Sequence, residues 1–178
     1  MGVPVEKARR WSTGNVLVFP EASFTRPADT TQYTANDVVS NSTATTELLV
    51  FRDCVRFAGG TGQLLSGLMF ATTDAATNPN FDLMLFDRPT ITLAADNAAS
   101  TVTDAEIRFF TAAITFDGTN ASNVATVGAN LIIGASAIAQ GFRCADGSRD
   151  LYGLVIDRGG YTPASAEQFR FRLCIAQD

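Results

Sequence analysis

Four aspartates in one part of the chain are the residues whose type and spacing could support acid–base chemistry. They are Asp82, Asp87, Asp96 and Asp104, all within the stretch 63–110. A glycosidase needs two carboxylates that face each other across a cleft, but aspartate is also the ordinary residue of turns and helix starts. Because the chain has no histidine, Ser-His-Asp and Cys-His sites are excluded. We therefore expect no enzymatic activity and no catalytic residue. A polysaccharide hydrolase is only the third hypothesis, and the four aspartates are its sole support.

Two short motifs resemble ligand-binding loops but lack residues that those loops require. The glycine-rich stretch 59–62 has no Walker-type Lys-Ser/Thr and opens no G-x-G-x-x-G helix. The stretch 146–150 fails the EF-hand spacing and carries Arg149 in its middle. Both stretches are predicted to be hairpin turns, and we expect neither a cofactor nor a bound metal.

The three cysteines, Cys54, Cys144 and Cys174, lie in apolar strand candidates and form no C-x-x-C pair. An odd number of scattered cysteines predicts buried, reduced thiols in a protein made in a cytoplasm. One disulfide stays open as the alternative. The N-terminal residues lack the apolar region of a secretory signal, which agrees with this expectation.

The balance of charge bears on the partners of the protein. The sequence has 13 Lys+Arg against 18 Asp+Glu, a net charge of −5, which argues against nucleic acid because phosphate binding needs clustered positive charge. No apolar run approaches the roughly 18 residues of a membrane helix, so we expect no membrane partner. Lys7 is the only lysine. This arginine bias is typical of protein–protein contacts or of a genome bias, and both interpretations stay open.

Short apolar runs bounded by Gly, Pro, Asn and Asp predict the strands that would position these residues. The runs 64–71 and 81–86 are predicted to form a central hairpin. Thr103 and Glu106 form a capping-box pattern, which predicts one short helix near 103–110. Further strands are predicted at 15–20, 47–58, 111–116, 131–138, 151–157 and 168–176, with 151–157 central because it is apolar on both faces.

The strand at 168–176 shows the clearest alternation in the sequence. Its apolar residues at odd positions are predicted to face the core, while Arg170 and Arg172 face outward. Roughly eight strands and one short helix indicate an all-β fold, a two-sheet jelly-roll-like β-sandwich. We expect a single domain over 15–178, preceded by an extended N-terminal arm at 1–14.

Three passages between residues 24 and 110 resemble small virion proteins of tailed bacteriophages. They are Arg26-Pro27-Ala28-Asp29-Thr30-Thr31-Gln32-Tyr33 with Asn36-Asp37-Val38-Val39, then Leu83-Met84-Leu85-Phe86-Asp87 with Pro89 and Ala95-Asp96-Asn97-Ala98, and finally Thr103-Asp104-Ala105-Glu106-Ile107. The resemblance implies a capsid decoration, or cement, protein that binds the outer surface of the phage head. That family has no catalytic residues to carry over.

The resemblance also implies partners and a location. The expected partner is the major capsid protein, and the expected location is the capsid surface of the virion, after synthesis in the host bacterial cytoplasm. Because a small sandwich has sheet edges that must be covered, we expect a homotrimer, with a dimer as the alternative. The alternative function is a tail or baseplate adhesion module that binds a host-surface glycan, since sugar-binding modules share the sandwich architecture.

Five residues are predicted to contact partner proteins. Arg9, Arg10 and Trp11 lie together in the arm, and Trp and Arg are the residue types most often found as interface anchors. Arg26 and Tyr33 lie in the long polar stretch after the first strand, which is the other expected docking element. The alternative for Trp11 is that it packs on the protein's own sandwich.

Overall fold

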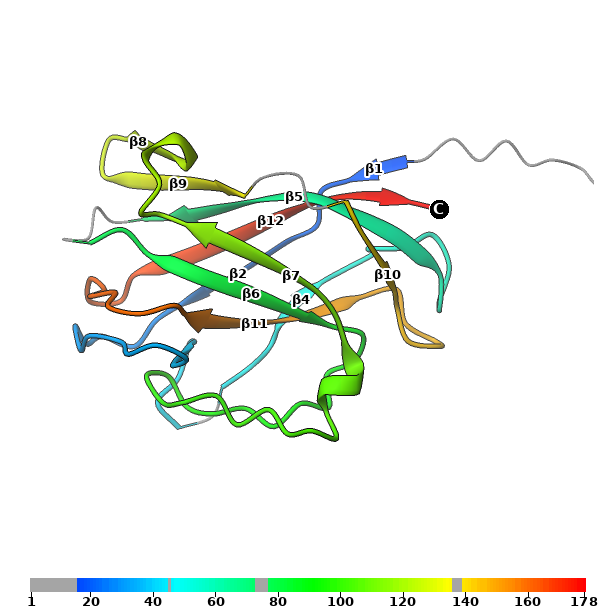
Figure 1. Ribbon diagram of the computed structural model, residues 1–178, viewed down its shortest axis with the longest axis horizontal. Coiled ribbons are helices and arrows are strands. Elements are labelled where there is room, and N and C mark those ends of the chain that lie inside the picture. The colour runs from blue at the N-terminus through cyan, green and yellow to red at the C-terminus, as the bar shows by residue number, and fades with distance from the viewer. Residues whose placement is uncertain (1–15, 45, 73–76, 136–138) are drawn as a thin grey trace, which may run out of the picture.

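Two antiparallel β-sheets pack face to face in the computed structural model, which describes residues 16–44, 46–72, 77–135 and 139–178 (Figure 1). The predicted all-β, two-sheet sandwich is confirmed. The predicted arm at 1–14, with Arg9, Arg10 and Trp11, lies outside the described residues.

The larger sheet has seven strands in the order β1-β12-β5-β9-β8, and in addition β2 pairs with β12 and β10 pairs with β5. The long strands β5 and β12 form its centre, because every other strand except β8 pairs with one of them. The strands are β1 (Val16–Val18), β2 (Glu21–Thr25), β5 (Thr61–Ala71), β8 (Val124–Val127), β9 (Asn130–Ala135), β10 (Gln140–Arg143) and β12 (Gln168–Gln177).

The smaller sheet has five strands in the order β3-β11-β6-β7, with β4 also pairing with β11. As the sequence predicted, β11 is central, and most of its side chains are buried. Only the start of the predicted strand 47–58 is extended, because the chain turns after β4 at Asp53, which has a φ of 56°. The strands are β3 (Val38–Val39), β4 (Leu49–Phe51), β6 (Asn80–Phe86), β7 (Phe110–Asp117) and β11 (Leu151–Asp157).

The predicted central hairpin of 64–71 with 81–86 is wrong, because β5 and β6 belong to different sheets. The two predicted hairpin turns are wrong for the same reason: 59–62 leads from β4 to β5, and 146–150 lies between β10 and β11, so both connect one sheet to the other. Alternation tells which side chains face the core. Both sheets share that core, so alternation leaves the pairing partner undetermined.

The main core lies between the sheets and is rich in phenylalanine. The inward-facing residues of β12 are buried as the alternation predicted. Phe169 packs edge-on against Phe81 of the other sheet, with ring centroids 5.3 Å apart. The sheets approach so closely at Gly67 that a Cβ atom there would lie 2.8 Å from Ile114 Cδ1. Large side chains therefore interdigitate between the two sheets, and Gly67 leaves the space that Ile114 occupies.

A second apolar cluster covers the outer face of the five-stranded sheet. We call the segment 87–106 the cover; in Figure 1 it runs below β6 and β11. Its residues Ile91 and Ala94 are buried with Leu154 and Ile156 of β11. This sheet is therefore packed on both faces, by the main core on one side and by the cover on the other.

The cover ends at a short helix, where the sequence predicted one near 103–110. Thr103 N donates to Glu106 Oε2 at 2.8 Å, and Thr92 N donates to Glu106 Oε1 at 2.6 Å. The helix that follows is one 3-10 turn, η1 (Ile107–Phe109), and a second such turn, η2 (Ala121–Asn123), precedes β8. No helix in the described part of the chain is long and apolar enough to cross a membrane.

Candidate functional site

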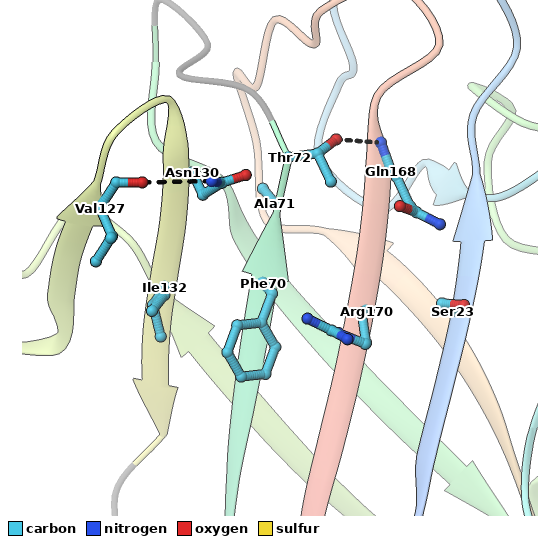
Figure 2. A pocket seen from close by; sticks show the side chains of 9 residues that line it. All are labelled: Ser23, Phe70, Ala71, Thr72, Val127, Asn130, Ile132, Gln168 and Arg170. Atoms are coloured by element: carbon cyan, nitrogen blue, oxygen red, sulfur yellow. Dashed lines mark hydrogen bonds between the residues drawn. The ribbon is translucent and has the colours of Figure 1, made fainter.

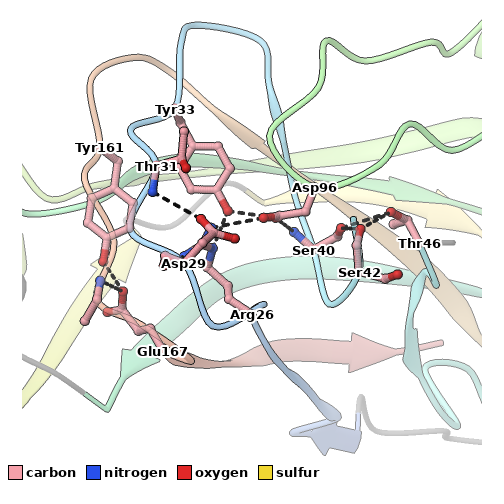
Figure 3. Close-up of polar contacts among 11 residues, drawn as sticks. Arg26, Asp29, Thr31, Tyr33, Ser40, Ser42, Thr46, Asp96, Tyr161 and Glu167 are labelled. Atoms are coloured by element: carbon pink, nitrogen blue, oxygen red, sulfur yellow. Dashed lines mark hydrogen bonds and ion pairs between the residues drawn. The ribbon is translucent and has the colours of Figure 1, made fainter. Parts of the chain in front are cut away.

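A buried ion-pair network joins the polar stretch after β2 to the cover (Figure 3). Arg26 Nη2 lies 3.0 Å from Asp96 Oδ2. Asp96 Oδ1 accepts hydrogen bonds from the Tyr33 hydroxyl and from the Ser40 backbone N–H, both at 2.7 Å. Arg26 Nε donates to the Tyr33 hydroxyl. Asp96 therefore holds three groups that come from the polar stretch after β2.

The electrostatics of this network follow from its burial. Burial raises the pKa of Tyr33, and the adjacent Asp96 carboxylate raises it further. Burial acts to lower the pKa of Arg26, but Tyr33 and Asp96 outweigh it, so the pKa of Arg26 is raised. Arg26 therefore stays charged and Tyr33 stays neutral, and the network needs Asp96 to balance the guanidinium.

The network also brings together passages that carry the resemblance to phage virion proteins. Asn97 N donates to Val38 O, and Val38 N donates to Ala98 O, both at 2.9 Å. Together with the ion pair between Asp96 and Arg26, these contacts join the first passage, 26–39, to the second passage, 83–98. The motif residues are thus fold-forming residues that meet inside the domain.

Arg26 and Tyr33, which were predicted to contact a partner protein, are only 2% and 1% exposed. Both side chains contact Asp96 and each other, and the Arg26 guanidinium also pairs with Asp29 at 3.4 Å. The described surface therefore offers neither side chain to a partner. The sequence could not reveal this, because Asp96 is 70 residues away from Arg26 along the chain.

The four aspartates considered for hydrolysis lie in separate environments. Asp82 and Asp87 each pair with an arginine, with N–O distances of 2.8 and 2.9 Å. Asp96 belongs to the buried network, and Asp104 is exposed. Among the described residues, no three His, Cys, Asp or Glu side chains gather closely enough to hold a metal ion.

One buried carboxyl group, that of Asp157, has an unusual environment at the end of β11. Burial raises its pKa to about 6, and the nearby Asp37 carboxylate acts in the same direction. The N–H groups of Gly159 and Tyr161 lie close enough to lower the pKa somewhat, although among the described residues no donor meets hydrogen-bond geometry at either oxygen. Asp157 is therefore a group whose charge opposes folding at neutral pH.

All three cysteines are free thiols. Cys54 and Cys144 are buried, and burial raises the pKa of both, that of Cys144 to about 12. Cys174 is half-buried and faces outward from β12. The prediction of reduced thiols agrees with this arrangement, but the prediction that all three are buried is wrong for Cys174.

The outer face of the seven-stranded sheet contrasts with the covered face, because no described segment lies across it. Its residues alternate with core residues, as Leu68 and Phe70 do with the buried Met69. Phe19 is 57% exposed and Val127 is 62% exposed. We call this surface the bare face and define it by Leu17, Phe19, Leu68, Phe70, Val127, Arg170 and Arg172.

A hollow of about 460 Å³ lies on the bare face where β5 ends and β12 begins. Figure 2 shows the side chains that line it. The Arg170 guanidinium lies beside the Phe70 ring, with Cζ 4.9 Å from the ring centroid. The Gln168 amide and the Ser23 hydroxyl line the same hollow. A second hollow of about 250 Å³ adjoins it, lined by Phe19, Leu68, Arg172 and Cys174 among others.

The two arginines of the bare face differ in their partners. Arg172 pairs with Glu21 across neighbouring strands. Arg170 pairs with no carboxylate among the described residues, and its Phe70 contact leaves the guanidinium N–H groups free to bind an anion. Sequence alternation predicted that both arginines face outward. It could not predict the hollow, which exists because β5 pairs with β12 and β9 far along the chain.

No protein-family model matches this sequence, and no curated protein is similar to it. The fold and the site define an all-β sandwich with one covered outer face and one bare outer face.

Proposed function

We propose that the protein is a non-enzymatic capsid decoration protein, which binds the outer surface of a tailed-phage head and stabilises the assembled shell. The observation that carries the proposal is the meeting of the motif passages. Arg26 and Tyr33 from the first passage contact Asp96 from the second, and Glu106 from the third holds the cover at Thr92. The first two passages meet in a buried network, whereas the Glu106 contact with Thr92 is exposed. Residues that resemble a family and also contact one another support a shared fold more strongly than scattered matches would.

The proposed mechanism is stabilisation by mass action. A protein that binds the assembled lattice of the major capsid protein, and not its separate subunits, shifts the assembly equilibrium toward the lattice. The sandwich suits this role because both sheets share one packed core. A rigid domain loses little conformational freedom when it binds.

The test compares phage heads assembled with and without this protein. We expect heads without it to lose resistance to heat and to chelators, and we expect many copies per particle on the head. Unchanged resistance would contradict the proposal, as would a location on the tail, where only a few copies occur.

Self-association belongs to the same proposal. We propose a homotrimer on threefold or quasi-threefold sites of the head, with a dimer on twofold sites as the alternative, since closed symmetry covers exposed sheet edges. Analytical ultracentrifugation of the isolated protein measures the oligomer. A protein that is monomeric both in solution and on the particle would contradict this part.

A further inference from the structure

We propose that the bare face is the surface that docks on the phage head, and that Arg170 binds a side-chain carboxylate of the head protein there. This inference rests on the proposed function for the identity of the partner. Its physical basis is independent of the resemblance: exposed apolar side chains, an arginine that pairs with no carboxylate among the described residues, and two hollows lie on one sheet face.

The bare face carries several large apolar side chains that stay exposed. Phe19, Leu68 and Val127 are exposed on the bare face, and Leu17 lies on the same side of the sheet. Exposed apolar side chains that gather on one surface, with polar groups around them, mark interaction sites. The opposite outer face is already packed by the cover, so the same reasoning does not apply to it.

Arg170 is the charged residue that lines the hollow beside Phe70. The protein has a net charge of −5, yet the residues that line the main hollow include Arg170 and no acidic residue. The Phe70 ring holds the guanidinium in place. A guanidinium that is fixed in this way loses less freedom on binding, and its N–H groups match the two oxygens of a carboxylate.

The chemistry of the bare face favours a protein partner over a glycan. Its apolar members are mainly aliphatic, with Leu17, Leu68 and Val127 besides the two phenylalanines, whereas exposed tyrosine or tryptophan rings would suit a sugar ring better. The same face of a second copy is also a poor partner, because its acidic residue, Glu21, already pairs with Arg172. A head-protein surface that presents Asp or Glu among apolar side chains fits best.

The experiment measures binding of the purified full-length protein to heads of the phage that encodes it, assembled without it. The variants on the bare face are Arg170→Ala and Leu68→Asp. The chain offers matched controls on the covered side. Arg108 stacks on the Phe109 ring at 4.6 Å, as Arg170 does on Phe70, and Ile107 is exposed as Leu68 is. Arg108→Ala and Ile107→Asp are therefore the controls.

We expect Arg170→Ala and Leu68→Asp each to weaken head binding at least about tenfold, while the two control variants bind like the wild-type protein. Thermal unfolding of each variant shows that the fold is retained. Arg170→Glu should weaken binding further, because it places a carboxylate against the partner's carboxylate.

Each other outcome overturns a definite part of the account. If the wild-type protein does not bind heads, the proposed function fails, and this inference fails with it. If the wild-type protein binds heads and the bare-face variants bind equally well, only this inference fails. If the variants leave head binding intact but dissociate a solution oligomer, a second copy covers the bare face. If they abolish binding to immobilised host-surface polysaccharide instead, the occupant is a glycan.

Discussion

The two outer faces of the sandwich have opposite relations to the rest of the chain. The five-stranded sheet is covered by the segment 87–106, whose Ile91 and Ala94 pack on Leu154 and Ile156. The seven-stranded sheet carries Leu68 and other apolar side chains that the described structure leaves exposed. Apolar residues on the covered face therefore contribute to folding. Those on the bare face contribute little to folding, and our proposal assigns them to binding.

The largest expected effect comes from detaching the cover at Asp96. Asp96→Ala should lower the free energy of unfolding by about 3–5 kcal/mol, because the buried Arg26 loses its nearer carboxylate and keeps only Asp29 at 3.4 Å, and because the Tyr33 hydroxyl and the Ser40 N–H lose their acceptor. Denaturant unfolding measures the change. As a control, Arg52→Ala removes an exposed pair at 3.9 Å and should cost no more than about 1 kcal/mol. A small loss for Asp96→Ala would show that the cover does not depend on the network.

A matched pair of leucines tests the comparison of the two faces directly. Leu154 under the cover is 3% exposed, and Leu68 on the bare face is 37% exposed. Leu154→Ala should lower the free energy of unfolding by about 3 kcal/mol through lost burial and a cavity, whereas Leu68→Ala should cost about 0.5 kcal/mol or less. Equal losses at the two positions would remove the distinction between the faces.

The pH dependence of stability should arise from the five-stranded sheet, at Asp157. Its folded pKa of about 6 lies above its ordinary value of 3.8, so folding favours the protonated form. The stabilising contribution is complete below the ordinary pKa and is lost as the pH rises through the folded pKa.

Lowering the pH from about 7.5 to about 5 should therefore raise this contribution to the free energy of unfolding by about 1 kcal/mol. The chain has no histidine to titrate in this range. Asp157→Asn should remove this part of the pH dependence, while Arg170→Ala should leave it unchanged. A wild-type profile that Asp157→Asn does not alter would assign the effect to another group.

The smallest expected effect is a difference in labelling rate among the three cysteines. Cys174 lines a hollow of the bare face, whereas Cys54 and Cys144 are buried and burial raises their pKa. N-ethylmaleimide should therefore label Cys174 first in the folded protein, as peptide mass spectrometry can show. On decorated heads Cys174 should be protected relative to the free protein. Faster labelling of Cys54 or Cys144 would contradict the assigned burial.

Strand positions could be predicted from the sequence because alternation and turn residues are local signals. The predicted run 151–157 coincides with β11, and the alternation of β12 assigned Arg170 to the outer face. Strand pairing could not be predicted, because the inward residues of β5 and β6 are buried in the core whether the two strands pair with each other or lie in different sheets, as they do. The connection between them is also long enough to cross the sandwich.

For the site residues too, local signals gave the residue types but not the contacts between distant parts of the chain. Arg26 and Tyr33 were predicted to lie at an interface because their residue types are common there, but they are buried with Asp96, a partner distant in sequence. Phe70 was not singled out, because it becomes a platform for Arg170 only once β5 and β12 are paired. Long-range pairing therefore determines both the buried network and the bare face.

A cryo-EM reconstruction of the decorated head tests the central claim most directly. The account predicts that the bare face, with Arg170 and Leu68, lies against the shell, with an acidic side chain of the head protein in the hollow beside Phe70. The cover, 87–106, should then point to solvent. A reconstruction in which the cover lies against the shell and the bare face points to solvent would contradict the account.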